Sequence, residues 1–235
     1  MTSLKILSGG AARGLVANLA PEFKERTGLA IEGEFGAVGA MAGKLREGMP
    51  TDLVVLTAAL IADLAKENLV TSASVSDIGQ VETAIAVRDG DPLASVHDAT
   101  SLRAVLLGSD AIFVPDTKAS TAGIHVAKVL TQLGIAEEVA ARLKIYPNGA
   151  AAMRHLAASD ASRPVGMTQS TEIISTEGVR LSGPLPKGSD LSTVYTAAVT
   201  TGAAHARQAQ ILVELLTGAG QRELRAQAGF LEAQK

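Results

Sequence analysis

The sequence predicts an α/β protein of two lobes, each a mostly parallel sheet flanked by helices, with two crossover strands joining the lobes. Short apolar runs alternate with helical segments along most of the chain, which is typical of parallel sheets. Apolar residues make up 47% of the chain and aromatic residues only 3%. This composition favours helices packed on a sheet over an aromatic-rich β-sandwich. Two strand-like runs, residues 83–87 and 193–200, connect the two sets of β–loop–α units and are predicted as the crossovers.

The first set contains three β–loop–α units. We expect strands at residues 4–7, 30–35 and 53–56, and helices at residues 11–27, 40–47 and 57–67. Gly28 and Gly48 stand where left-handed residues end helices. Thr57 is placed to cap the third helix. Three such units in succession predict a parallel sheet.

The second set follows the first crossover. We expect a short helix capped by Thr100, strands at 111–114, 143–146 and 165–167, helices to 133 and over 150–158, and a helical turn at 172–175. The glycines and prolines of residues 178–192 predict irregular chain. Two closing helices are expected at 203–216 and 221–228. The predicted lobes are residues 1–82 with 199–235 (lobe I) and residues 83–198 (lobe II).

Composition also excludes several classes of function. A net charge of -3 without a basic run gives no footprint for nucleic acid. There is no cysteine, and the four histidines show no metal-ligand spacing, so no metal and no cofactor are expected. No Gly-x-Ser-x-Gly elbow is present, and no apolar run is long enough for membrane insertion. Met1-Thr2-Ser3 leads directly into the first strand, which predicts a cytoplasmic protein, or a periplasmic one if this is a processed form.

The loops that follow the predicted strands are rich in Gly, Ser, Thr, Asn and Gln. Ligands of parallel α/β sheets bind outside the carboxyl ends of the strands, where helix N-termini attract anions. Taken singly, each loop is explained by ordinary helix capping or by a tight turn. Taken together, they predict a cleft between the lobes for a small anion, with these candidate ligand-binding residues: Ser8, Gly9, Gly10, Ala11, Arg13, Ala37, Val38, Thr57, Ser120, Thr121, Asn148, Gly149 and Gln169.

Arg13 departs from local preference, because a cation in the first turn of a helix opposes the helix dipole. Either its side chain extends into water or it meets a bound anion. A guanidinium suits a carboxylate, which it binds in a bidentate manner. Arg88, just past the first crossover, is a second and weaker candidate.

The loop order, together with Val165-Gly166-Met167-Thr168-Gln169-Ser170-Thr171-Glu172-Ile173 and Gly183-Pro184-Leu185-Pro186, resembles the molybdate-binding-protein-like branch of bacterial solute-binding proteins. The resemblance covers essentially the whole chain. It implies the type II periplasmic-binding fold, whose two lobes close on an oxyanion or carboxylate, and, for an exported protein, a membrane transporter as partner.

Carried over by position, the resemblance implies ligand contacts at Ser8 and at two backbone-donating loops, Ser120-Thr121-Ala122 and Asn148-Gly149. The family's second-loop hydroxyl falls near Ala37-Val38, where this chain has none. The tyrosine of molybdate binders falls at about Gln169. With two donors absent and Arg13 nearby, an organic carboxylate is at least as well supported as molybdate.

The same branch resembles aconitate isomerase, which moves a double bond in a tricarboxylate and needs a general base. The base candidates are Glu34, Asp116, His125 and Glu172, each with a simpler structural explanation as a turn, strand or helix residue. Three hypotheses follow: a solute-binding protein, a cytoplasmic isomerase of a di- or tricarboxylate, and a cytoplasmic ligand sensor acting on a partner protein. We rank binding first, because the loops supply hydrogen-bond donors clearly and a base only ambiguously.

Overall fold

The computed structural model describes residues 3–232 and divides into two compact units. Unit 1 comprises Met1–Val81 and Thr193–Lys235, and unit 2 comprises Glu82–Ser192. Two strands, β4 (Ser76–Arg88) and β9 (Ser192–Val199), run across the unit boundaries. The sequence places the second boundary after residue 198, whereas the contacts place it after Ser192. The reason is that β9 pairs with β3 of unit 1 from Tyr195 to Val199.

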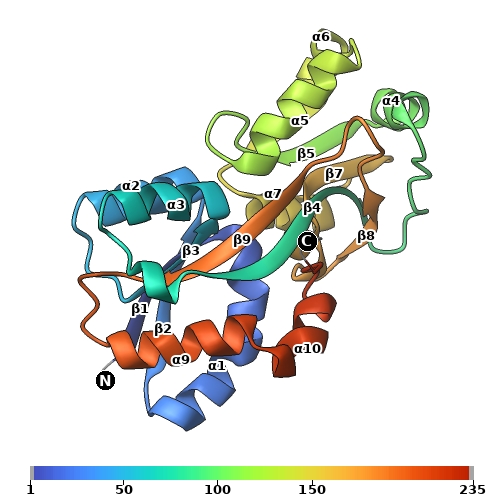
Figure 1. Cartoon of the computed structure of the whole chain (residues 1–235). Helices are drawn as coiled ribbons and strands as arrows, with labels where there is room; N and C mark the ends of the chain where they lie inside the picture. Colours follow the sequence, from blue (N-terminus) through green and yellow to red (C-terminus); the bar gives the residue numbers. More distant parts are fainter. Residues whose placement is uncertain (1–2, 233–235) are drawn as a thin grey trace. The chain divides into compact units, whose positions relative to one another are not determined.

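Unit 1 is built on a sheet in the order β2-β1-β3-β9 (Figure 1). Strands β1, β2 and β3 are parallel, and β9 is antiparallel to β3. The elements of this unit are β1 (Ser3–Gly9), η1 (Gly10–Ala12), α1 (Arg13–Thr27), β2 (Ala30–Gly36), α2 (Val38–Arg46), β3 (Leu53–Thr57), α3 (Ala58–Lys66), η2 (Ser72–Ser74), α9 (Ala206–Thr217), η4 (Ala219–Gln221) and α10 (Arg222–Gln227). The three parallel β–loop–α units predicted from the sequence are therefore confirmed.

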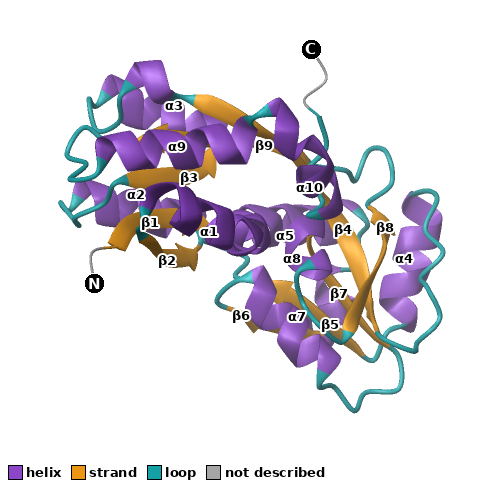
Figure 2. Ribbon diagram, turned by 90° about the horizontal axis from the view of Figure 1, so that it is seen from below, coloured by secondary structure: helices purple, strands orange, loops and turns teal. Residues whose placement is uncertain are grey.

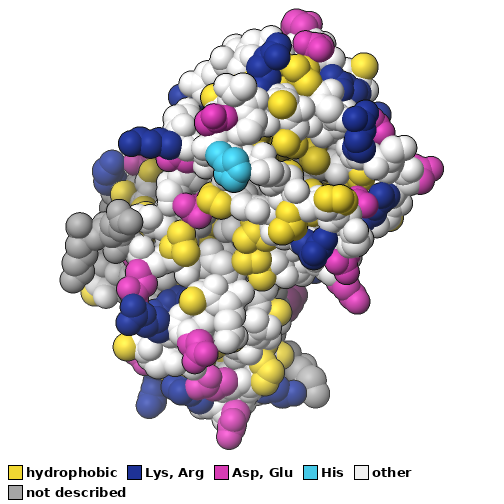
Figure 3. All heavy atoms as spheres, turned by 90° about the vertical axis from the view of Figure 1, so that its right-hand side faces the viewer, with side chains coloured by type: hydrophobic (Ala, Val, Ile, Leu, Met, Phe, Trp, Pro, Cys, Tyr) yellow, Lys and Arg dark blue, Asp and Glu magenta, His cyan; other side chains and the backbone are white. Residues whose placement is uncertain are grey.

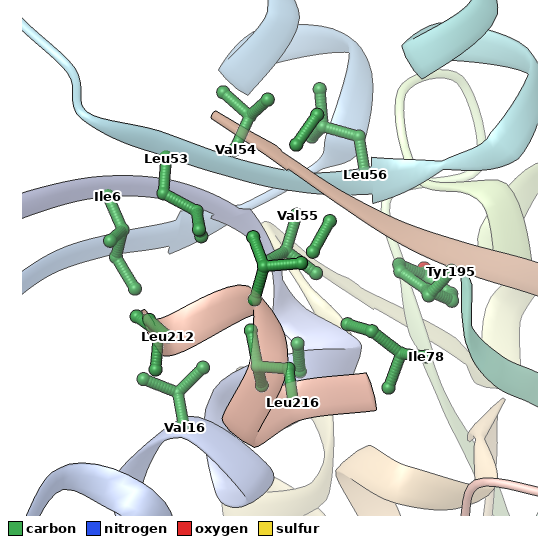
Figure 4. Close-up of a cluster of buried hydrophobic side chains, with 14 of the residues drawn as sticks. Ile6, Val16, Leu53, Val54, Val55, Leu56, Ile78, Tyr195, Leu212 and Leu216 are labelled. Carbon is green, nitrogen blue, oxygen red and sulfur yellow. The ribbon is translucent and has the colours of Figure 1, made fainter. Parts of the chain in front are cut away.

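Apolar residues of β3 alternate between the two faces of the unit 1 sheet. Figure 4 shows Leu53 and Val55 directed toward Leu212 and Leu216 of α9, while Val54 and Leu56 lie on the opposite side. All of these side chains are buried. Helices α2 and α3 contact the sheet, and α1 packs against α9 (Figure 2). Because both faces are covered by helices, β3 is apolar throughout rather than alternating in polarity.

Unit 2 holds a mixed sheet in the order β4-β7-β5-β6, with β8 on the other side of β4. Strand β5 is parallel to β6 and β7, while β4 is antiparallel to β7 and β8. Its elements are α4 (Ala99–Gly108), β5 (Ala111–Pro115), α5 (Thr121–Gln132), α6 (Ala136–Val139), η3 (Ala140–Arg142), β6 (Leu143–Tyr146), α7 (Gly149–Ala157), β7 (Pro164–Gln169), α8 (Ser170–Ile174) and β8 (Val179–Pro184).

Two hydrophobic clusters cover the two faces of the unit 2 sheet. Ile85 and Ile112 belong to a cluster with residues of α4 and α5. Ala84 and Phe113, their neighbours in sequence, belong to a cluster with Met153 of α7 and Ile173 of α8. The period of two along β4 and β5 is the one expected of strands buried on both sides.

Three details differ from the sequence-based expectations. Residues 179–184 form strand β8 rather than irregular chain, and the register of its pairing with β4 shifts between Ile85 and Ala86. Helix α6 was not expected. Helix α4 is capped by Asp98 in a capping box with Ser101, so the assignment of its cap to Thr100 is wrong. A local Asp–Ser exchange of hydrogen bonds fixes the helix start two residues earlier.

Candidate functional site

The carboxyl ends of the parallel strands in unit 1 lie at one edge of the sheet. Gly9, at the end of β1, is in register with Gly36, at the end of β2. Ser8 is in register with Val55, shortly before β3 ends at Thr57. Each strand passes directly into a helix, namely η1 with α1, α2 and α3. The predicted unit 1 residues, from Ser8 to Thr57, therefore gather at this edge.

The helix starts at this edge are free of side-chain caps. Helix α2 follows Ala37, which has no capping group, and α3 follows Thr57, whose hydroxyl makes no capping hydrogen bond. The short helix η1 after Gly9 also lacks a side-chain cap. First-turn N–H groups that no side chain caps favour a bound anion. Thr57 thus occupies the expected capping position without performing that role.

The first loop is tightly enclosed. Ser8 is fully buried, and its hydroxyl donates to the carbonyl of Gly9 at 2.9 Å. A Cβ atom on Gly9 would lie 2.8 Å from Val38 Cγ1 and 2.9 Å from Cε1 of Tyr195. Glycine is therefore required there by close approach of α2 and β9. Tyr195 is held in turn by an edge-on contact with Phe230, at 6.4 Å between ring centroids. Sequence patterns give no signal for these two aromatic supports.

Arg13 begins α1 and is exposed. Its guanidinium carbon lies 5.8 Å from the centre of the Phe35 ring, at the end of β2, which is a cation–π distance. Among residues 3–232, no ion pair involves Arg13. The structure thus places this cation beside the strand ends of unit 1 without a carboxylate partner.

In unit 2 the ends of β5, β6 and β7 also share one edge of the sheet. Pro115 of β5 is in register with Tyr146 of β6, and β7 runs parallel to β5. Helices α5, α7 and α8 follow these strands after Ser120, Asn148 and Gln169, respectively. The predicted unit 2 residues therefore also lie at strand ends.

The capping states of these three helix starts differ. Ser120 makes no side-chain cap, and Thr121 is the first residue of α5 rather than a cap. Asn148 caps α7 by accepting from the N–H of Ala151 at 2.9 Å. Gln169 is buried and its side chain does not cap α8. Thr171, two residues on, has a buried hydroxyl oxygen without a hydrogen-bond partner.

The four candidate bases all contact other groups of the protein. Glu34 is exposed and paired with Lys44. Asp116 Oδ1 accepts from the N–H groups of Lys118 and Ala119 at 2.7 and 3.0 Å, as an Asx turn does. The last two are His125, whose Nε2 lies 2.8 Å from the carbonyl of Ser189, and Glu172, which is enclosed behind the start of α7.

Arg88 does not belong to the strand-end loops. Val87 is in register with Val165 near the start of β7, whereas Thr83 is in register with Gln169 at its end. Arg88 therefore lies at the opposite edge of the unit 2 sheet. There it pairs with Asp91 at 3.1 Å and donates to the carbonyl of Ser159. This position gives no support to a ligand contact for Arg88, because β4 is antiparallel to β7.

Among residues 3–232, no group of three or more His, Cys, Asp or Glu residues could hold a metal ion. Within the same range, no helix has both the length and the apolarity needed to cross a membrane. On the face shown in Figure 3, acidic and basic side chains are interspersed, and neither sign forms a continuous field.

The fold and the strand-end loops define an α/β protein of the periplasmic-binding class. The chain belongs to the family described as bacterial extracellular solute-binding protein, which matches residues 4–231. The resemblance inferred from the sequence is therefore confirmed.

Two curated relatives and one solved structure illustrate the relationship. The chain is 23% identical to an aconitate isomerase of Pseudomonas sp over 225 residues, covering 92% of this chain and 82% of the relative. It is 21% identical to the molybdate-binding protein ModA of Escherichia coli (strain K12) over 206 residues, covering 85% and 77%. The periplasmic molybdate-binding protein of Azotobacter vinelandii superimposes with a TM-score of 0.82 at 19% identity, covering 99% of this chain and 100% of that chain.

Proposed function

We propose that the protein binds a small oxyanion or organic carboxylate through the strand-end loops. The observation that carries this proposal is the set of uncapped helix starts at one edge of the unit 1 sheet. Such starts present N–H groups and positive dipole ends to the same region. Membership of a solute-binding family supports the same conclusion.

The positions of Arg13 and Ala37 favour a carboxylate over molybdate within this proposal. Arg13 is a cation without a carboxylate partner in the described chain, and it stands over Phe35 beside the first loop. Ala37 precedes α2 and offers no hydroxyl to an oxyanion. A guanidinium matches the planar geometry of a carboxylate better than that of a tetrahedral oxyanion.

A thermal-shift and calorimetric screen with molybdate, tungstate, sulfate, citrate and cis-aconitate tests the proposal. A ligand at about 100 times its Kd stabilises the native protein by about 2.7 kcal/mol, so the melting temperature rises measurably. We expect at least one probe to bind, and the carboxylates to bind more tightly than molybdate. The proposal fails if none of the five shifts the melting temperature or releases heat.

The second candidate is an isomerase of a di- or tricarboxylate on the same scaffold. The relationship with aconitate isomerase, which spans 92% of this chain, is the observation that favours it. Ultraviolet absorbance with cis- and trans-aconitate would detect the migration of the double bond. If turnover occurs, the variants His125→Gln and Asp116→Asn test the base, since loss of a general base lowers kcat by about 10²- to 10⁴-fold. If aconitate binds without turnover, the isomerase hypothesis is rejected and the solute-binding function remains.

We also propose that the protein works outside the cytoplasm and delivers its ligand to a membrane transporter. The family's description as extracellular supports the periplasmic alternative over the cytoplasmic one. Release of the natively expressed protein by osmotic shock, together with a periplasmic marker enzyme, is the expected result. Retention with a cytoplasmic marker would contradict this localisation.

A further inference from the structure

Glu172 is a buried carboxyl group that the proposed ligand contacts do not use. It lies in α8 and is 5% exposed. Thr168, at the end of β7, donates its hydroxyl to Oε2 at 2.6 Å. The carboxyl group also lies against the first residue of α7, because a Cβ atom on Gly149 would be only 2.0 Å from Oε2. One acidic side chain thus joins the first turn of α7 to the end of β7.

Glu172 is held by a neutral donor and by the start of a helix rather than by a cation. Its hydrogen bond comes from the Thr168 hydroxyl and, within residues 3–232, it forms no ion pair with a Lys, Arg or His. Gly149, which the carboxyl group abuts, opens the nine-residue helix α7, where the positive end of the dipole lies. The first turn of α7 is therefore occupied on this side by an internal carboxyl group.

The fit between Glu172 and α7 depends on glycine at position 149. A Cβ atom there would lie 2.0 Å from Glu172 Oε2 and 2.1 Å from Thr168 Oγ1. Contacts this short are not found in proteins, so any larger residue would separate the helix from the carboxyl. Gly149, Thr168 and Glu172 therefore form one closely packed group.

We propose that Glu172 is a positioning residue for the anion site in unit 2. Its carboxylate fixes the start of α7 and the end of β7, and through them Asn148 and Gln169, which stand at the strand ends. This inference rests on the proposed function, because it assigns Glu172 to the support of the ligand loops rather than to ligand contact or proton transfer. Its role depends on a carboxyl group at this point and not on side-chain volume alone.

Chemical rescue of Glu172→Ala tests this role. The variant leaves space for a small anion against Gly149, Ala150 and Thr168. We expect it to bind citrate or molybdate, whichever the wild type binds, roughly 10- to 100-fold more weakly. Losses of this size follow when residues that orient metal-binding side chains by hydrogen bonds are mutated. Formate should restore most of the affinity, and neutral formamide of similar size should not. Glu177→Ala, an exposed neighbour, is the matched control and should respond to neither additive.

Two results would overturn the proposal: wild-type affinity in Glu172→Ala, or equal rescue by formate and formamide. If Glu172→Ala does not fold, Glu172→Gln replaces it, because glutamine keeps the side-chain volume and removes the carboxyl group. Undiminished anion affinity in folded Glu172→Gln would also reject the proposal. If the wild type binds no probe, the proposed function fails, and amide hydrogen exchange decides the inference separately. Exchange at Gly149, Ala150 and Gln169 should then quicken in the variant and slow again with formate; unchanged exchange would refute the role.

Discussion

At the scale of single residues, Arg13 is the sharpest test of the kind of ligand. We expect Arg13→Ala to weaken binding of citrate or cis-aconitate by roughly 1–3 kcal/mol, since a hydrogen bond to a charged group is lost. Calorimetry measures the change. Arg207→Ala is the matched control, because Arg207 is also exposed in the first turn of a helix of unit 1. It follows β9, which is antiparallel to β3, so it stands at the other edge of the sheet. If Arg13→Ala binds the carboxylate as tightly as the wild type does, Arg13 does not contact the ligand.

The first loop provides a second test at this scale. A Cβ atom on Gly9 would meet Val38 and Tyr195 at 2.8 and 2.9 Å, so Gly9→Ala must displace the loop. We expect a loss of roughly 1–3 kcal/mol in the free energy of unfolding, as for other overpacked sites, together with weaker anion binding. Gly39→Ala is the control, because nothing lies within 4 Å of its Cβ position in α2. It should raise stability by about 0.5–1 kcal/mol. If Gly9→Ala changed neither the free energy of unfolding nor the anion affinity, the loop would not be constrained by Val38 and Tyr195.

At the scale of elements, mutations at the start of α4 can test whether Asp98 or Thr100 is its N-cap. Asp98 accepts from the N–H of Ser101 at 2.8 Å, whereas the sequence pattern assigns the cap to Thr100. Asp98→Ala should therefore lower the melting temperature, and Thr100→Ala should leave it nearly unchanged. The hydrogen bonds from Ser101 also lower the pKa of Asp98, so the difference between the variants should shrink as the pH falls through that pKa. A larger effect of Thr100→Ala would contradict the structure.

Local patterns predicted most helices and the parallel strands, because these elements carry strong apolar periodicity. They missed β8, whose Gly183 and Pro184 are typical of loops and which is a strand because β4 supplies its hydrogen-bond partners. They also found the candidate loops at the strand ends, since each follows a strand whatever the tertiary contacts. They could not assign roles within those loops. The burial of Glu172 against Gly149 and the support of Gly9 by Tyr195 join segments distant in sequence.

At the scale of the whole molecule, the buried charge of Glu172 predicts how the stability of the chain depends on pH. Burial raises the pKa of Glu172 above its ordinary value, opposed by hydrogen bonds from Thr168 and from the backbone N–H groups of Ala150, Gln169 and Gly149. Between the ordinary and the raised pKa the native state binds more protons than the unfolded state. The contribution of Glu172 to stability is therefore present below the ordinary pKa and is lost as the pH rises through the raised one.

Glu172→Gln removes this titration while keeping the size of the side chain. The melting temperature of the variant relative to the wild type should therefore rise as the pH increases above the ordinary pKa of glutamate, which is about 4.3. Glu177→Gln, at an exposed position, should show no such trend. A flat difference between Glu172→Gln and the wild type would mean that the carboxyl is not desolvated. A positive trend combined with weaker anion binding would show that this chain retains a destabilising buried charge in order to hold its loops in place.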